Sequence, residues 1–221
     1  MNNGNNNRIR IKTINVLFAG QYAVGKSCLI QNYFGHKLND DYFYYSYLDT
    51  PTKNIKDEDS EYRIRIFDFP GKERFMSTIS SYLRYSKVVV LVFDMTRKES
   101  FLYLDRILEL IYEERDINEY MFVLIGNKAD VRDKWEIKES DAKKFADIIH
   151  AKFLLTSAKN EPKILQEFLD KAFIDYIRLY NVGLNGQPNQ RRQQNIILNR
   201  GNRRRRRGLC SWMNRDSNYY F

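Results

Sequence analysis

The chain has 221 residues, of which 43% are hydrophobic, and carries a formal net charge of +9. This length fits one domain with tails, and the apolar share is large enough for a core. The longest apolar runs are only as long as a strand, so no membrane-spanning helix is expected. Two cysteines in very different contexts predict no disulfide framework and favour a reducing compartment.

Residues 1–10 are rich in asparagine, and a segment of such low complexity is predicted to be disordered. Residues 11–20 then form a predicted strand that ends in glycine, and residues 26–34 form a predicted short helix. An aromatic-rich segment, DDYFYYSYLDTPT, follows this helix. The next predicted strand, residues 61–69, alternates apolar and charged side chains, as a half-exposed strand does.

Residues 87–94 and 121–127 are continuous apolar runs, which are typical of buried strands in a parallel sheet. A further strand is predicted at 152–158, and amphipathic helices are predicted at 99–115, 139–151 and 161–180. Strands that alternate with helices predict an α/β fold with a doubly wound sheet. In such a sheet the ligand lies at the carboxyl ends of the strands, so the loops that follow them are expected to hold the function.

The positive charge is concentrated in the predicted flexible tail, residues 182–221. This tail contains nine arginines and a single acidic residue, and therefore eight of the nine net charges. The predicted domain, residues 11–181, is nearly neutral by comparison. A neutral domain with a strongly basic tail predicts an anionic partner for the tail and not for the domain.

The segment GQYAVGKS, residues 20–27, matches the phosphate-loop pattern G-x-x-x-x-G-K-[ST]. A chance match is expected in roughly one in a hundred chains of this length, and fewer still would have it between a strand and a helix. The glycines let successive backbone amides surround phosphate oxygens. Lys26 is expected to reach the β- and γ-phosphates, and Ser27 to bind Mg²⁺. The predicted nucleotide contacts here are Gly20, Tyr22, Ala23, Val24, Gly25, Lys26, Ser27 and Cys28.

Two short motifs follow later strands and point to a guanine base. In NKAD, residues 127–130, the Asp130 carboxylate can accept two hydrogen bonds from guanine, whereas adenine lacks that donor pair. In TSAK, residues 156–159, a backbone amide can donate to guanine O6. Each motif alone is a weak signal because surface loops often contain such residues. Their order and their places at strand ends favour a guanine nucleotide.

Over residues 11–180 the chain resembles small GTPases of the Ras superfamily, and most of all their Rab branch. The resemblance rests on GKSCLI, IFDFPGKERF, SSYLRYSKVVVLVFDMTRKESF, IGNKAD and TSAK. It implies a P-loop GTPase fold with a six-stranded, mostly parallel sheet and about five helices, which binds GTP or GDP with Mg²⁺. It also implies that Asp68 joins Ser27 at the metal and that the Gly71 amide meets the γ-phosphate. The implied base pocket consists of Asn127, Lys128, Asp130, Ser157, Ala158 and Lys159.

The segment FDFPGKERF departs from the WDTAGQERF that Rab proteins usually have. Lys72 stands where the family has the glutamine that orients the attacking water. A glutamine both accepts from water and donates to phosphate, whereas an ammonium group only donates. Pro70 stiffens the turn and removes one amide. We therefore expect Lys26, Gly71 and Lys72 at the reacting phosphate, with binding retained and hydrolysis slow.

Two further departures indicate slow hydrolysis. The family prefers a small residue at the position of Tyr22, and a tyrosine there is expected to block an arginine finger, which can contribute about 10³–10⁵ in rate. The Mg²⁺-binding threonine of switch I falls near Tyr45, and a tyrosine is a poor ligand for this metal. Ser46 and Thr50 are alternatives if the loop shifts.

The aromatic side chain that usually covers the guanine falls near Leu38, with Tyr42 and Phe43 as alternatives. Seven aromatic residues occur nearby, namely Tyr33, Phe34 and those within 42–47. An equally good interpretation is that this tyrosine-rich loop is a surface for partner proteins.

The arginine-rich tail suggests how the chain could reach a membrane. Rab proteins end in prenylated cysteines, whereas here Cys210 lies outside any C-a-a-X box, so prenylation is not expected. Arg203–Arg207 lie beside Cys210, and one acyl chain together with a polybasic patch is enough for stable membrane association. A nuclear import signal, a nucleic-acid contact and a simply solvated tail are the alternatives.

Together these features predict a monomeric, Rab-like GTP/GDP switch in membrane traffic that hydrolyses GTP slowly. It is expected on the cytosolic face of an intracellular or plasma membrane, with effector proteins bound through switch regions I and II. One alternative is a GTP-bound scaffold that does not hydrolyse its nucleotide. Another is a nuclear or RNA-associated GTP-binding protein that uses the arginine-rich tail.

Overall fold

The computed structural model describes residues 11–36, 50–58, 60–114, 120–160 and 162–180. The Asn-rich N-terminus, the arginine-rich tail and most of the tyrosine-rich loop lie outside these ranges. The strands are β1 (Lys12–Ala19), β2 (Thr52–Asp57), β3 (Ser60–Asp68), β4 (Val88–Asp94), β5 (Met121–Asn127) and β6 (Lys152–Leu155). The helices are α1 (Lys26–Tyr33), α2 (Met76–Tyr85), α3 (Lys98–Glu114), α4 (Glu139–Ile148) and α5 (Pro162–Tyr180).

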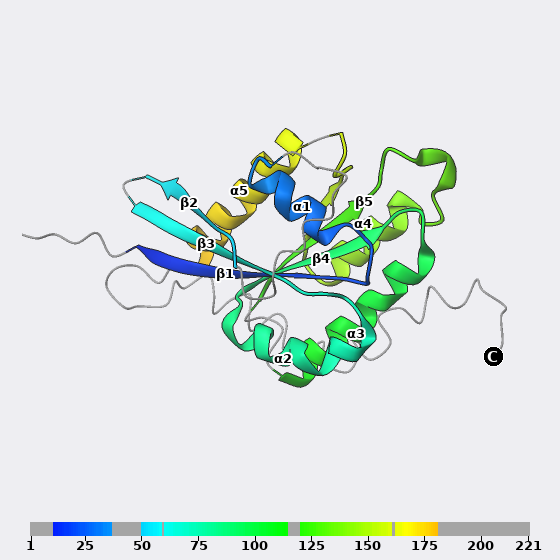
Figure 1. Ribbon diagram of the computed structural model, residues 1–221, viewed down its shortest axis with the longest axis horizontal. Helices are drawn as coiled ribbons and strands as arrows, with labels where there is room; N and C mark the ends of the chain where they lie inside the picture. Colours follow the sequence, from blue (N-terminus) through cyan, green and yellow to red (C-terminus); the bar gives the residue numbers. More distant parts are fainter. Residues whose placement is uncertain (1–10, 37–49, 59, 115–119, 161, 181–221) are drawn as a thin grey trace, which may run out of the picture.

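The six strands form one sheet in the order β2-β3-β1-β4-β5-β6, and Figure 1 shows its twist. Only β2 is antiparallel, since it forms a hairpin with β3, and the other four neighbouring pairs are parallel. Every residue of β4 and β5 is buried, as the apolar runs predicted. This six-stranded, mostly parallel sheet with five helices confirms the expected α/β class and P-loop GTPase fold.

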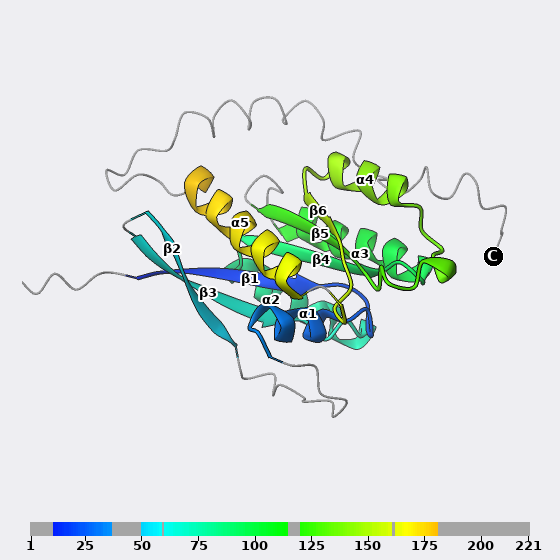
Figure 2. The same cartoon turned by 90° about the horizontal axis from the view of Figure 1, so that it is seen from above.

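Helices cover both faces of the sheet and make two apolar cores. Helices α1 and α5 lie on one face, where Leu29 and Phe173 share a core with the β4 side chains Val88, Val90 and Val92. Helices α2, α3 and α4 cover the other face, where the Phe101 ring packs against the rings of Phe93 and Phe145. Figure 2 shows α5 and α1 along β1 and β3, with α4 beside β6. None of the described helices is long and apolar enough to span a bilayer.

Two elements had not been located from the sequence. Strand β2 has only one buried side chain, Ile55, so its apolar pattern is weak, and its pairing with β3 holds it in the sheet. Helix α2 buries Ile79 and Leu83, which are four positions apart and therefore lie on one face. Strand β2 pairs along β3, and α2 follows the loop after β3.

The predicted ends of two elements were wrong. Helix α4 stops at Ile148 and not at residue 151, because His150 adopts a left-handed conformation (φ 53°) and the Ala151 amide donates back to Ala146 O at 2.8 Å. Strand β6 ends at Leu155 and not at residue 158. After it, the Thr156 amide donates to Gly126 O and the Ala158 amide donates to Asn127 Oδ1.

An ion pair and an aromatic contact fasten β2 to α5. Lys53 Nζ lies 2.9 Å from Asp170 Oδ2 and 4.3 Å from the centre of the Tyr33 ring. The Tyr33 hydroxyl donates to Asp170 Oδ1 at 2.6 Å, and its side chain is buried. Tyr33 is thus part of the core between α1 and α5, which removes it from the aromatic residues available to a base or a partner.

Candidate nucleotide-binding site

The phosphate loop connects β1 to α1 at the carboxyl edge of the sheet. Its backbone takes left-handed turns at Ala23 (φ 63°) and Gly25 (φ 95°). A Cβ atom at Gly25 would lie 2.3 Å from Asn127 Nδ2, so this position requires glycine for space as well as for conformation. The close approach joins the phosphate loop directly to the predicted base pocket. Val24 is fully buried beneath the loop.

Lys26 opens α1 and is almost completely buried, at 5% exposure. Its Nζ donates to Gly20 O at 3.0 Å and to Gln21 O at 2.8 Å, which curls the loop around the ammonium group. Burial lowers the pKa of Lys26 to about 8; the Asp68 carboxylate acts in the opposite direction, and Arg97 adds to the lowering. A nearby phosphate would offset this cost of burial by restoring an anionic partner.

Ser27 and Asp68, the predicted metal ligands, lie side by side. Ser27 Oγ donates to Asp68 Oδ2 at 2.5 Å. Asp68 Oδ1 is buried and has no hydrogen-bond partner among the described residues, and burial raises the pKa of this carboxyl group. A hydroxyl beside a carboxylate with an unused buried oxygen fits Mg²⁺, which usually takes one or two protein ligands and completes its shell with phosphate oxygens and water. No cluster of three His, Cys, Asp or Glu side chains suited to a metal occurs in the described parts of the chain.

The loop after β3 packs directly on the phosphate loop. Phe69 is fully buried, and its amide extends the β1–β3 ladder by donating to Phe18 O at 3.0 Å. Two residues later, Gly71 has a positive φ of 71°. A Cβ atom at Gly71 would lie 2.2 Å from Gly20 O and 2.6 Å from Lys26 Nζ. The Gly71 backbone therefore lies against the end of the phosphate loop, where the γ-phosphate was expected.

Tyr22 and Lys72 touch each other across this junction. The Lys72 Nζ lies 4.8 Å from the centre of the Tyr22 ring, which is a cation–π contact. Tyr22 is half exposed, and Lys72 is exposed. From the sequence these were two separate departures from the family pattern. The structure joins them into one surface pair at the mouth of the phosphate site.

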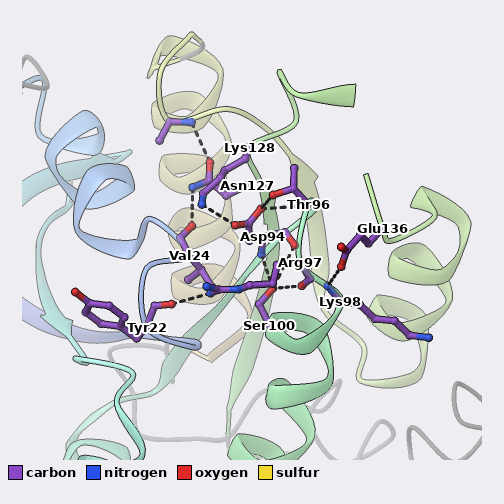
Figure 3. A network of polar contacts seen from close by, with 11 residues as sticks. Tyr22, Val24, Asp94, Thr96, Arg97, Lys98, Ser100, Asn127, Lys128 and Glu136 are labelled. Atoms are coloured by element: carbon purple, nitrogen blue, oxygen red, sulfur yellow. Dashed lines mark hydrogen bonds and ion pairs between the residues drawn. The ribbon is translucent and has the colours of Figure 1, made fainter. Parts of the chain in front are cut away.

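At the base end, Asn127 links three loops (Figure 3). Its side chain is 2% exposed; Nδ2 donates to Val24 O at 2.8 Å and Oδ1 accepts from the Ala158 amide at 3.0 Å. The Asn32 side-chain amide of α1 also donates to Ala158 O. The asparagine predicted in the base pocket thus serves first as a connector that holds the phosphate loop and residues 156–159 in register.

Lys128 is held by an aspartate that sequence motifs did not reveal. Lys128 Nζ lies 2.6 Å from Asp94 Oδ2, and Asp94 Oδ1 accepts from both the amide and the hydroxyl of Thr96 (Figure 3). Burial alone would raise the pKa of Asp94, but these hydrogen bonds from Lys128 and Thr96 lower it. The signal was present in the sheet order, since Asp94 and Asn127 are paired neighbours at the ends of β4 and β5.

Arg97 is a second residue of the site that no sequence motif indicated. Its Nη2 donates to Tyr22 O at 2.7 Å, and Figure 3 shows the guanidinium group reaching across from the start of α3 to the phosphate loop. The start of α3 is itself fixed, because Ser100 Oγ accepts from the Asp94 amide and Glu136 Oε2 accepts from the Lys98 amide. Arg97 therefore connects the base end of the site to the phosphate end.

The remaining residues predicted to contact the nucleotide differ in their exposure. Asp130 and Lys159 are exposed on the turns after β5 and β6, whereas Ser157 is buried and its Oγ accepts from the Lys159 amide at 3.2 Å. Cys28 is half-buried, and burial raises the pKa of its thiol. The turns after β5 and β6 lie at the same edge of the sheet as the phosphate loop.

The switch I predictions concern residues that the structure does not describe. Leu38, Tyr42, Phe43, Tyr45 and Ser46 all lie within residues 37–49, outside the described ranges. Thr50, the other alternative for the switch I threonine, is described and is partly buried just before β2. Which residue of this loop meets the metal therefore stays a prediction.

A comparison with protein families agrees with this geometry. The family model described as Ras family matches residues 15–175. The matched segment begins within β1, includes every loop described above and ends within α5.

Proposed function

The chain belongs to the Ras family and is a small GTP-binding switch protein, and on that premise we propose that it is a Rab-like regulator of membrane traffic with slow GTP hydrolysis. The convergence of Lys26, the Ser27–Asp68 pair and Asn127 at one edge of the sheet is the observation that carries the nucleotide assignment. The Rab-like role rests on the resemblance of the motifs from phosphate loop to TSAK.

Each part of the site has a separate task in binding. Lys26 neutralises β- and γ-phosphate charge, and the backbone amides of the phosphate loop surround the oxygens. Ser27 and Asp68 would hold Mg²⁺, and the ion would neutralise phosphate charge there. Asp130 would accept hydrogen bonds from the guanine edge. Asn127 keeps the two ends at a constant separation.

Slow hydrolysis follows from the residues at the γ-phosphate. In the reaction, water attacks the γ-phosphorus in line with the β–γ bridging oxygen, that bond breaks, and GDP and phosphate leave. Gly71 approaches this position through its backbone, but Lys72 can only donate hydrogen bonds and cannot accept one from the attacking water. Tyr22 adds bulk where a partner would insert an arginine. Tyr22 and Lys72 together support the proposal that the protein remains bound to GTP for longer than its relatives do.

A GTP-bound scaffold is the second candidate function, and the Tyr22–Lys72 contact also favours it. Both functions use switch I and switch II as surfaces for effector proteins, and we propose that the chain acts as a monomer. They differ in turnover alone. Freshly purified protein should contain mostly GTP if hydrolysis is slow or absent, and chromatography of the released nucleotide measures this. Protein that contains only GDP would contradict both.

The membrane assignment rests on the tail, residues 182–221. We propose that Arg203–Arg207 contact anionic lipid on the cytosolic face of a membrane and that an acyl group on Cys210 strengthens this contact. The alternative is that the arginines direct the chain to the nucleus or to RNA.

Imaging of a tagged chain in cells separates these possibilities. Cys210→Ala should weaken the membrane pool, and truncation after Gly201 should abolish it. If the pool is lost only on truncation, the arginines act without an acyl group. A truncated chain that stays on membranes, or an intact chain found in the nucleus, would overturn the assignment.

A further inference from the structure

The contact between Tyr22 and Lys72 brings two unusual residues of the nucleotide site together. The Lys72 ammonium group lies 4.8 Å from the centre of the Tyr22 ring. An ammonium group over an aromatic face is attracted by the negative charge of that face. Because a free lysine side chain samples many rotamers, the ring reduces the number of positions that this ammonium group occupies.

The backbone beneath the Tyr22 ring is fixed from the opposite side. Arg97 Nη2 donates to Tyr22 O at 2.7 Å, and Figure 3 shows the ring turned away from this contact. The next residue, Ala23, has a left-handed conformation that shapes the loop. The ring therefore projects from a part of the phosphate loop that is tied to α3, and its place is determined by the fold.

The backbone beneath Lys72 is fixed as well. Gly71 lies so close to the phosphate loop that a Cβ atom would be 2.2 Å from Gly20 O. On the other side, Lys72 O accepts from the Phe75 amide at 2.9 Å. Both partners of the cation–π contact therefore start from positions that the surrounding structure holds, which is what a positioning contact requires.

The position of Lys72 in the chain indicates which ligand its ammonium group would bind. A Cβ atom at Gly71 would lie 2.6 Å from Lys26 Nζ, so Lys72 follows directly after the residue that faces the phosphate-binding lysine. An ammonium group on the residue that follows Gly71 would attract the γ-phosphate, which GTP has and GDP lacks. An ammonium group that is already held in place loses less freedom when it binds phosphate.

We propose that the ring of Tyr22 positions the Lys72 ammonium group beside the γ-phosphate, so that the pair raises the preference of the protein for GTP over GDP. Tyr22 is thus a positioning residue that acts through Lys72, and the two act as a unit. The inference rests on the proposed function, since it presupposes that the site binds guanine nucleotides. It also gives a functional reason for the presence of Tyr22 in the phosphate loop.

The test measures the dissociation constants of GDP and of β,γ-imido-GTP for the full chain with Mg²⁺, by competition against a fluorescent GDP. The dissociation constant of GDP divided by that of the analogue measures the preference for the triphosphate. Lys72→Gln should lower it about tenfold, because a charge-assisted hydrogen bond is lost. Tyr22→Ala should lower it about threefold, as expected for an exposed cation–π contact. Tyr85→Ala, which changes another exposed tyrosine, should leave it unchanged.

Conservative variants distinguish positioning from a merely structural role. Tyr22→Phe retains the ring and Lys72→Arg retains the charge, so both should keep the parental ratio within about twofold. The double variant Tyr22→Ala/Lys72→Gln should match Lys72→Gln alone, because the ring acts only through the lysine. A far-ultraviolet circular dichroism spectrum that matches the parent's shows that each variant is folded.

Two results would overturn the inference. One is an equal loss of GDP and analogue affinity in Tyr22→Ala, which would indicate a structural role. The other is a higher preference for the analogue after the ring is removed, which would mean that Tyr22 holds Lys72 away from the phosphate. Failure of the parent protein to bind either nucleotide would instead contradict the proposed function.

Discussion

The two ends of the nucleotide site are held by different kinds of contact. At the base end, Asn127 is 2% exposed and makes two hydrogen bonds to other loops within the core. At the γ-phosphate end, Tyr22 is 50% exposed and meets Lys72 in a surface cation–π contact. Buried hydrogen bonds are expensive to lose, whereas an exposed cation–π contact contributes only about 0.5–1 kcal/mol.

This difference implies that the γ-phosphate end tolerates substitution more readily than the base end. A substitution at Tyr22 or Lys72 alters side chains at the surface and leaves both apolar cores untouched. A substitution at Asn127 disconnects the phosphate loop from residues 156–158. A substitution at the γ-phosphate end is therefore expected to reduce stability less than one at the base end.

The largest effect is expected for Lys26→Ala, which removes the buried cation expected at the β-phosphate of GDP and at the β- and γ-phosphates of GTP. Loss of one partner of a buried charged contact should weaken GDP binding by about 3 kcal/mol or more, which is at least about a hundredfold. Competition with a fluorescent nucleotide measures this. Lys163→Ala is the matched control because its side chain is 88% exposed on α5. Loss of less than about fivefold would exclude Lys26 from the phosphate site.

Asp130→Asn tests the base end directly. Replacing the carboxylate removes two charge-assisted hydrogen bonds to guanine, so the preference for GDP over ADP should fall by about 2–3 kcal/mol, which is roughly 30- to 160-fold. Binding of both nucleotides to the variant, measured in the same competition assay, gives the ratio. A variant with full guanine preference would show that Asp130, exposed on its turn, does not contact the base.

Asn127→Ala should reduce stability. The variant leaves Val24 O and the Ala158 amide without their buried partner, which should lower the free energy of unfolding by about 2 kcal/mol. Thermal unfolding of the GDP-loaded protein should shift down by about 4–8 °C.

The matched comparison for Asn127→Ala is Tyr22→Ala, at the opposite end of the site. Because Tyr22 is half exposed, its replacement should change the free energy of unfolding by at most about 1 kcal/mol. Asn54→Ala, at an exposed asparagine on β2, should change it by less than about 0.5 kcal/mol. Equal losses for Asn127→Ala and Tyr22→Ala would remove the distinction between the two ends.

The sequence predicted those parts of the site that local patterns encode. Lys26, Ser27 and Asn127 occur in short nucleotide-binding motifs that directly follow strands. The motifs alone were therefore sufficient to predict these residues as part of the site. Strand and helix types were also predictable, because β4 and β5 are fully buried and α3 is amphipathic. The end of α4 was not, since it depends on a single left-handed residue, His150.

Contacts between distant segments could not be predicted. Tyr22 and Lys72 meet only because the Gly71 backbone packs on the phosphate loop, which requires the pairing of β1 with β3. Asp94 belongs to no nucleotide motif and acquires its role from the neighbouring strand. Residues in such tertiary relationships have no fixed spacing, and only the assembled sheet reveals them.

We propose that this site binds GTP well and hydrolyses it slowly because Lys72 cannot accept a hydrogen bond from the attacking water. Single-turnover hydrolysis of preloaded GTP, compared between the parent and Lys72→Gln, tests it most directly. The glutamine variant should hydrolyse GTP about tenfold faster, at the lower end of what a positioned polar side chain contributes. A parent that hydrolyses GTP as fast as the variant would contradict the account.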